Sequence, residues 1–238
     1  MVPQPQPLES PPLADLVAAI TEAAAADLWN TIGPVDNPDQ ALEALLNTLP
    51  PIINKYGEAA GAVSADWYEN DRDAHLNRGN FNAQVPDMGD TGAEELARWA
   101  VDPLYQDEPD WGAAQSRTEG GLQRRVANHS RQTIMSAAVA DPKSRGWQRL
   151  TAGTGGCGFC TMLASRGVVY RTEFAADFGA HDWCGCTAVS AWDNREKPVQ
   201  PYKPSKHQAT DAEKARTRSW IKKNLPGVEE SHHARSKE

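Results

Sequence analysis

Long hydrophobic runs are missing from this chain of 238 residues. No apolar stretch approaches the ~20 residues that a membrane-spanning helix requires, which excludes an integral membrane protein. The first residues, Met1 to Pro7, carry neither the basic region nor the apolar stretch of a secretory signal, which predicts a product of the cytoplasm that is not exported by that route. Aromatic residues make up 7% and apolar residues 39% of the chain, so the material for a hydrophobic core is limited.

Motifs of the common hydrolases are missing as well. The sequence contains no Gly-x-Ser-x-Gly and no His-Glu-x-x-His, the arrangements that expose a nucleophile or hold a catalytic zinc ion. Ser165 and His129 are isolated, and we interpret them as a surface residue and a core residue. The sequence therefore predicts no catalytic residue and a protein that is not an enzyme.

Positive charge is scarce at the front of the chain. Residues 1–112 hold 20 acidic and 4 basic side chains, residues 113–194 hold 6 and 9, and residues 195–238 hold 6 and 11. The net charge of −8 therefore conceals an acidic front and a basic rear. This asymmetry predicts different partners for the two parts, or different faces of one assembly. The rear surplus alone is too small to indicate nucleic-acid binding.

Apolar residues recur at helical spacing through the first 140 residues. The predicted helices run from Ser10-Pro11-Pro12 to Gly33, from Asn37-Pro38 to Pro50-Pro51, from Ile52 to Leu76, from a capping box at Thr91 and Glu94 to Val101, and from about Ala113 to Ala140. Short connections predict that these helices are antiparallel neighbours, and residues 79–90 are predicted to form a loop. In the last helix, Gly120-Gly121 predicts a kink or the true start, and Arg131 is expected on the outside.

The pattern changes after Pro142. Short strands are predicted at Trp147–Thr151, Val168–Tyr170 and Thr187–Trp192, and a short helix at Thr161–Arg166. From Asn194 the chain is polar and rich in proline, which predicts an extended arm that carries one charged helix at about Thr210–Lys223 and a flexible tail.

All four cysteines lie within 30 residues, as Cys157-Gly158-Phe159-Cys160 and Cys184-Gly185-Cys186, and His181 precedes the second pair. Two residues between thiolates allow one turn to present both sulfurs to a cation, and a second pair about 20 residues later can complete a tetrahedron around Zn²⁺. Five donors compete for four positions: Cys157, Cys160, His181, Cys184 and Cys186. The first choice is Cys157, Cys160 and His181 with either Cys184 or Cys186, and the second choice is the four cysteines.

A structural role suits this donor set better than a catalytic one. Thiolates donate charge to the metal and weaken it as a Lewis acid, and a catalytic zinc ion keeps an open position. One structural zinc ion would supply folding energy to a segment with few apolar residues. Two disulfides would require an oxidising compartment, and a thioredoxin-like redox pair would require a strand–helix–strand unit before the motif; the sequence supports neither.

These patterns together predict an α+β, mostly helical protein. An acidic N-terminal helical region would occupy residues 1–110, a long helix with the zinc-stabilised lobe residues 111–193, and a basic arm with one helix and a tail residues 194–238.

Residues 115–192 resemble minor capsid proteins of tailed bacteriophages, in particular head-morphogenesis proteins of the phage Mu F type found in phages of actinobacteria. The resemblance rests on Gly146–Leu150, on Cys157–Tyr170 and on Ala180–Cys186. In that family the paired cysteines and the His-x-x-Cys-x-Cys element are the metal-binding motifs, which correspond here to Cys157, Cys160, His181, Cys184 and Cys186.

The resemblance implies a structural virion protein in the head interior or at the portal vertex, with a role in head assembly and in DNA packaging or ejection. The implied partners are the portal protein or the major capsid protein, and packaged DNA is a further candidate for the basic arm. No membrane and no small-molecule substrate is expected. Two alternatives stay open at this point: a capsid maturation protease or other virion-associated hydrolase, and a zinc-dependent DNA-binding module.

Overall fold

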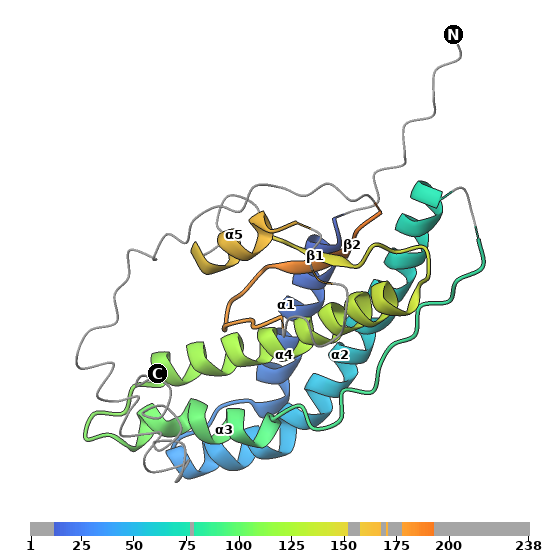
Figure 1. The fold of residues 1–238 in the computed structure, drawn as a ribbon. Coiled ribbons are helices and arrows are strands. Elements are labelled where there is room, and N and C mark those ends of the chain that lie inside the picture. Colours follow the sequence, from blue (N-terminus) through green and yellow to red (C-terminus); the bar gives the residue numbers. More distant parts are fainter. Residues whose placement is uncertain (1–11, 77–78, 152–157, 168–169, 171–177, 193–238) are drawn as a thin grey trace. The chain divides into compact units, whose positions relative to one another are not determined.

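The computed structural model describes residues 12–76, 79–151, 158–167, 170 and 178–192. The chain divides into two compact units, residues 1–202 and 203–238, and every described residue belongs to the first. The elements in chain order are α1 (Leu13–Ile32), α2 (Pro38–Leu76), α3 (Ala93–Val101), the 3₁₀ turn η1 (Asp102–Tyr105), α4 (Trp111–Ala140), β1 (Trp147–Leu150), α5 (Gly158–Ser165) and β2 (Thr187–Ser190) (Figure 1). The described part is thus mostly helical with one small sheet, as predicted. None of its helices is both long enough and apolar enough to cross a membrane.

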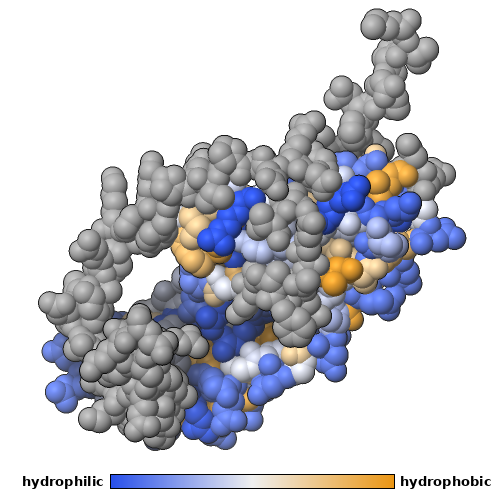
Figure 2. Space-filling view, viewed as in Figure 1, coloured by the Kyte–Doolittle hydropathy of each residue, from blue (hydrophilic) through white to orange (hydrophobic). Residues whose placement is uncertain are grey.

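Helix α4 packs against α1, α2 and α3, and also against β2. Its N-terminal half contributes Leu122 and Val126 to a core of leucines and alanines from the three earlier helices. Its C-terminal half contributes Ile134 and Met135 to a second core, which contains Trp147 and the buried cysteines. One helix therefore supports both the bundle and the segment that carries the sheet. In the view of Figure 2, hydrophilic side chains cover much of the described surface, and the hydrophobic patches are small.

The predicted break at Pro50-Pro51 is wrong, because α2 continues through both prolines. Each proline removes a backbone donor and crowds the carbonyl one turn earlier, at a cost of ~3 kcal/mol or more in a helix interior. Leu49 and Ile53, on either side of the pair, are fully buried, and burying such a side chain contributes about 1.5–3 kcal/mol. A break would remove part of this apolar stripe from the core, so tertiary packing overrides the local signal. The second and third predicted helices are one helix, not antiparallel neighbours.

The predicted capping box at the start of α3 is also wrong, although the helix itself is confirmed. The residue before the helix is Gly92, with a φ of 66°, and no side chain caps the helix. The Glu94 carboxylate instead accepts a hydrogen bond of 2.6 Å from Arg98, one turn further on. The carbonyls of Thr91 and Gly92 accept hydrogen bonds from Arg125, so α4 holds the segment where a cap would be expected.

Gly120 and Gly121 do not start α4, because the helix begins at Trp111 and runs through both. A Cβ atom at Gly121 would overlap Leu96 of α3, and a Cβ atom at Gly120 would lie 2.6 Å from the indole nitrogen of Trp183. The two glycines therefore permit close approach of α3 and of the loop before β2. Arg131, predicted on the outside of this helix, is 2% exposed, which corrects that prediction.

The small sheet pairs β1 with β2 in an antiparallel register from Trp147 opposite Ser190 to Leu150 opposite Thr187. Tyr170 forms an isolated bridge with Trp147. The Trp147 ring is 1% exposed and stacks on Tyr170 at 4.4 Å between centroids. The predicted first and third strands are thus confirmed, each one or two residues shorter than predicted, and of the predicted strand at 168–170 only Tyr170 is described. The predicted helix at 161–166 starts earlier, at Gly158.

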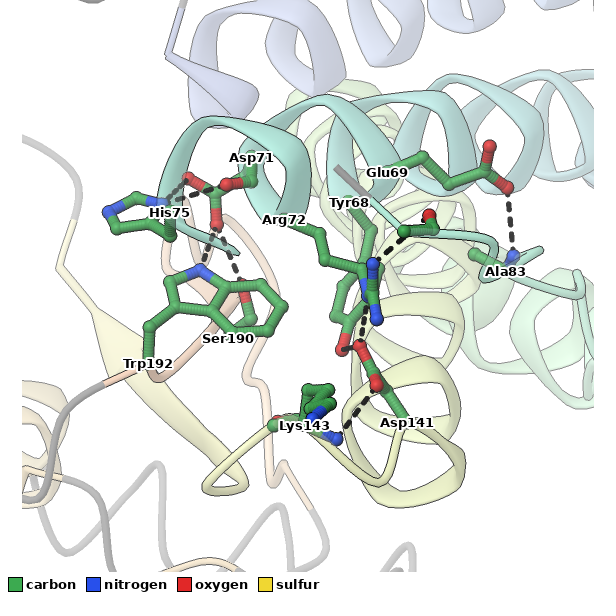
Figure 3. A network of polar contacts seen from close by, with 12 residues as sticks. Tyr68, Glu69, Asp71, Arg72, His75, Ala83, Asp141, Lys143, Ser190 and Trp192 are labelled. Atoms are coloured by element: carbon green, nitrogen blue, oxygen red, sulfur yellow. Dashed lines mark hydrogen bonds and ion pairs between the residues drawn. The ribbon is translucent and has the colours of Figure 1, made fainter. Parts of the chain in front are cut away.

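Polar contacts join the end of α2 to the end of α4 and to β2 (Figure 3). Asp141, directly after α4, accepts a hydrogen bond of 2.7 Å from Arg72 of α2, and both side chains are buried. Asp71, also in α2, accepts hydrogen bonds from the Ser190 hydroxyl at 2.8 Å and from the Trp192 indole at 2.7 Å. The sheet is therefore attached directly to the helical bundle. The predicted arm, helix and tail of residues 194–238 lie outside the described residues.

Candidate metal centre

Three of the five predicted donors come together between α5 and β2. Cys160 lies in the first turn of α5, and His181 and Cys184 lie in the loop that leads to β2. One ligand atom from each of the three residues lies within 4.8 Å of the others. Cys160 is fully buried and Cys184 is 1% exposed, whereas His181 is exposed. Among the described residues, these three form a group that could bind a metal ion.

The sulfur atoms have the spacing of a tetrahedral zinc site. The Sγ atoms of Cys160 and Cys184 are 3.8 Å apart, which is far beyond the ~2.05 Å of a disulfide bond. Two Zn–S bonds of about 2.3 Å at a tetrahedral angle place their sulfur atoms about 3.8 Å apart. The donors therefore fit zinc without a change in the separation of these two sulfurs.

The backbone of the loop that carries His181 and Cys184 is held by α4. The Cys184 carbonyl accepts a hydrogen bond of 2.6 Å from Arg131 and one of 3.1 Å from Gln123, and the Cys186 carbonyl accepts one of 3.0 Å from Arg131. The Cys184 amide donates to the His181 carbonyl at 3.1 Å, which closes the turn between the two donors. Side chains from a rigid helix thus set the loop conformation.

The ring of His181 makes a contact that favours one tautomer. Its Nδ1 atom lies 2.6 Å from the carbonyl oxygen of Asp182, and because a carbonyl only accepts, Nδ1 must be the donor. The lone pair of the neutral ring is then on Nε2, the form in which histidine binds metals. The carboxylate of Asp182 lies 3.2 Å from Nε of Arg124. Trp183, between these residues and Cys184, has a φ of 62° and lies against Gly120.

Two buried arginines lie beside the cysteines, and no described carboxylate pairs with either of them. Arg131 and Arg149 are each 2% exposed. Arg149 donates a hydrogen bond to Cys160 Sγ at 3.3 Å, and both guanidinium groups lie over the Phe178 ring, at 4.9 Å and 3.7 Å from its centroid. A buried charge without a counter-charge is strongly destabilising. The cysteine sulfurs lie beside these arginines and can supply the counter-charge as thiolates.

The pKa shifts of Cys184 and Arg131 agree with a pairing of thiolates and arginines. Hydrogen bonds from the Cys160 and Cys186 side chains, together with the charge of Arg131, lower the pKa of the Cys184 thiol, although burial opposes them. Burial lowers the pKa of Arg131 to about 10, while the three cysteines act to raise it. Arg131 therefore stays charged at neutral pH, and the lowered pKa of Cys184 favours the thiolate form that metals require.

Comparison with known proteins identifies the family of the chain. The VG15 protein family matches residues 11–211. The chain belongs to the VG15 family. This is a family of viral, phage-related gene products, so the sequence-based expectation of a phage protein is supported at that level. No curated protein and no solved structure matches the chain.

In this VG15 protein the match covers all five donors predicted from the sequence. The structure brings Cys160, His181 and Cys184 together. Cys186 is 3% exposed and is not one of the three, and Cys157 lies outside the described residues. The identity of the fourth donor, Cys157 or Cys186, stays a prediction, as do the zinc ion and the choice between three and four thiolates.

Sequence reasoning missed the two arginines of the VG15 site. Arg131 lies four residues after Ala127 and three before Ile134, both buried, so the helical period would have placed it on the inner face of α4. Arg149 is two residues after the buried Trp147 in β1, and alternation places both on one face of the sheet. Phe178, between the arginines, follows no periodic pattern, and only its contacts reveal it.

Proposed function

We propose that this protein is a structural minor capsid protein of a tailed phage, in which one zinc ion fixes the Cys/His loop against the helical bundle. The observation that carries the zinc assignment is the pair of buried arginines beside the cysteine sulfurs. Neutral thiols would leave two guanidinium charges uncompensated in the core. A thiolate site with three or four sulfurs on Zn²⁺ carries net negative charge and supplies the compensation.

The ion would be held by Cys160, His181 and Cys184, with Cys157 or Cys186 as the fourth donor. When bound, it would contribute folding free energy rather than chemistry. Arg149 would orient the Cys160 thiolate through its hydrogen bond to the sulfur, and Arg131 would hold the loop through the Cys184 and Cys186 carbonyls. The positive charge of both arginines would screen the charge of the thiolates. His181, with its proton on Nδ1, would bind through Nε2.

A structural role suits the surroundings of the site. The cavity beside Cys184 has a volume of about 60 Å³ and is lined by α1, α4 and the loop, which at ~30 Å³ per water leaves room for about two water molecules and not for a peptide. Among the described residues, His129 Nε2 is buried without a hydrogen-bond partner, and Ser165 donates to the Met162 carbonyl within its own helix. Neither residue has the geometry of an activated nucleophile or its base.

The particle assignment is supported by membership of the phage-related VG15 family and by the resemblance of residues 115–192 to minor capsid proteins. We place the protein in the head interior or at the portal vertex, bound to portal or major capsid protein, where it supports head assembly and DNA packaging or ejection. Contact between the basic arm and DNA stays a prediction; it requires retention on DNA that weakens steeply with salt.

Metal analysis of the purified full-length chain tests the site. We expect about one zinc ion per chain, with loss of metal and of thermal stability in Cys160→Ala and Cys184→Ala. Of Cys157→Ala and Cys186→Ala, the variant that loses metal identifies the fourth donor, and Ser165→Ala serves as the control. A metal-free chain that is fully folded with reduced thiols would overturn the zinc assignment. Cross-linking of purified particles tests the location: links to portal or capsid protein are expected, and absence of the protein from particles contradicts the role.

A further inference from the structure

An apolar cavity lies where the end of α1, the start of α2, η1 and the start of α4 meet. Its volume is about 200 Å³, and its walls include Ile32, Leu45, Leu104 and Ala114. One water molecule occupies ~30 Å³, so the cavity has room for a large apolar side chain. The zinc site does not contribute to it, because no donor cysteine lines the cavity.

Two exposed aromatic residues stand beside this cavity. Trp111, which lines it, is 40% exposed, and Tyr105 of η1 is 54% exposed. The Tyr105 hydroxyl donates a hydrogen bond of 2.8 Å to Asp39, which ties η1 to the start of α2. Exposed tryptophan and tyrosine next to an apolar recess are typical of the centre of a protein–protein interface.

The chain segments that supply the walls of the cavity are strongly acidic, and we call their acidic side chains the rim. The two segments that supply its walls, residues 29–45 and 101–119, contain eight acidic side chains and one basic side chain. The basic side chain, Arg117, is already engaged: it lies 3.7 Å from Asp102 and over the Trp99 ring. Asp107 and Glu108 are exposed and make no hydrogen bond or ion pair within the described part of the chain. Such a rim repels acidic partners and attracts basic ones.

We propose that this cavity is a docking site for a basic amphipathic helix of another protein. An apolar side chain of that helix enters the recess beside Trp111, and its lysine and arginine side chains face the acidic rim. This is the helix-in-groove mode of recognition, in which apolar anchors give affinity and charge gives partner choice. The inference goes beyond the proposed function and does not depend on the metal.

The test measures binding of a labelled 14-residue amphipathic peptide of leucine and lysine to the full-length protein by fluorescence anisotropy. A scrambled peptide of the same composition and a leucine–glutamate peptide are the peptide controls. Ala114→Leu fills the recess, and Trp111→Ala removes an exposed wall without disturbing the core. Asp107→Lys with Glu108→Lys reverses the charge of part of the rim. The control is Glu58→Lys with Asp66→Lys, which makes the same change of charge at exposed positions of α2 away from the cavity.

We expect the amphipathic lysine peptide to bind at least tenfold more tightly than either control peptide. Ala114→Leu, Trp111→Ala and the rim reversal should each weaken binding by about tenfold, and the α2 reversal should change it less than threefold. Equal binding of the scrambled peptide, or unchanged binding by both recess variants, would overturn the proposal. Tighter peptide binding after Trp220→Ala with Ile221→Ala would identify residues 203–238 of this chain as the occupant, and would overturn the assignment to another protein.

Discussion

Replacement of Arg149 by methionine tests whether the cysteine site is a thiolate metal centre or a neutral apolar core. Arg149 is buried, donates to Cys160 Sγ at 3.3 Å and has no carboxylate partner among the described residues. A hydrogen bond to a charged group contributes about 1.5–3 kcal/mol, and loss of a residue that supports a metal ligand costs about 10- to 100-fold in metal affinity. Arg149→Met should therefore weaken zinc binding by about 10- to 100-fold.

The metal-free protein should respond in the opposite direction. Without the metal the cysteines carry less negative charge, so the guanidinium is a buried charge with less compensation, and its replacement by an apolar side chain should be neutral or stabilising. The assay is competition for zinc with a chromogenic chelator, together with thermal unfolding of the full-length chain with and without metal. Arg98→Met, which breaks an exposed pair with Glu94, is the control. Equal loss of stability in both forms with unchanged zinc affinity would refute the reasoning, because it would make Arg149 a packing residue only.

Three further variants, together with one glycine control, test contacts away from the metal. Asp141→Asn removes the charge that Arg72 faces in a buried pair, and should lower the free energy of unfolding by about 3–5 kcal/mol in denaturant titrations. Gly57→Ala places a Cβ atom into the His129 ring and should cost about 1–3 kcal/mol, whereas Gly112→Ala, with nothing closer than 3.5 Å, should be neutral or stabilising. Burial lowers the pKa of His129, so it should stay neutral in the folded chain, and His129→Leu should reduce the loss of stability seen as the pH falls below about 6.5.

The sign of the His129 prediction follows from linkage. The unfolded chain takes up a proton at this histidine at a higher pH than the folded chain does, so the contribution is complete above about pH 6.5 and declines below it. The prediction would be contradicted if the free energy of unfolding fell no more steeply in the wild type than in His129→Leu between pH 7.5 and 5.5. For Asp141, the matched control is Glu94→Gln in an exposed pair, which should cost under ~0.5 kcal/mol.

Local signals predicted the elements where tertiary contacts agree with them. Gly33 ends α1 and Asp141 ends α4 as expected. Burial alternates in the first half of β1 as its sequence indicates, whereas all four residues of β2 are buried. The Pro50-Pro51 pair shows the limit of such signals, because a continuous buried stripe on both sides stabilises a helix that local rules would end.

Charge was the least predictable property of the site. A cysteine-rich segment could be recognised from spacing alone, and the structure brings three of its donors together. Periodicity could have placed Arg131 and Arg149 on inner faces, but an arginine is usually exposed, and the local sequence gives no sign that cysteine sulfurs lie beside these two side chains. Their electrostatic role depends on the contacts of Arg131 and Arg149 with Phe178 and the cysteines. These contacts are set by the packing of α4, β1 and the loop before β2, and not by local sequence.

The Asp71 contacts have a consequence for the order in which the chain folds. This carboxylate binds Ser190 and Trp192, which are 119 and 121 residues further along. During synthesis from the N-terminus, α1 to α4 emerge and can associate while the last strand is still inside the ribosome. Closure of so long a loop is slow relative to local contacts. The cysteine segment should therefore join a bundle that is already assembled, and a chain terminated before residue 187 would leave the end of α2 without the partners that cover it.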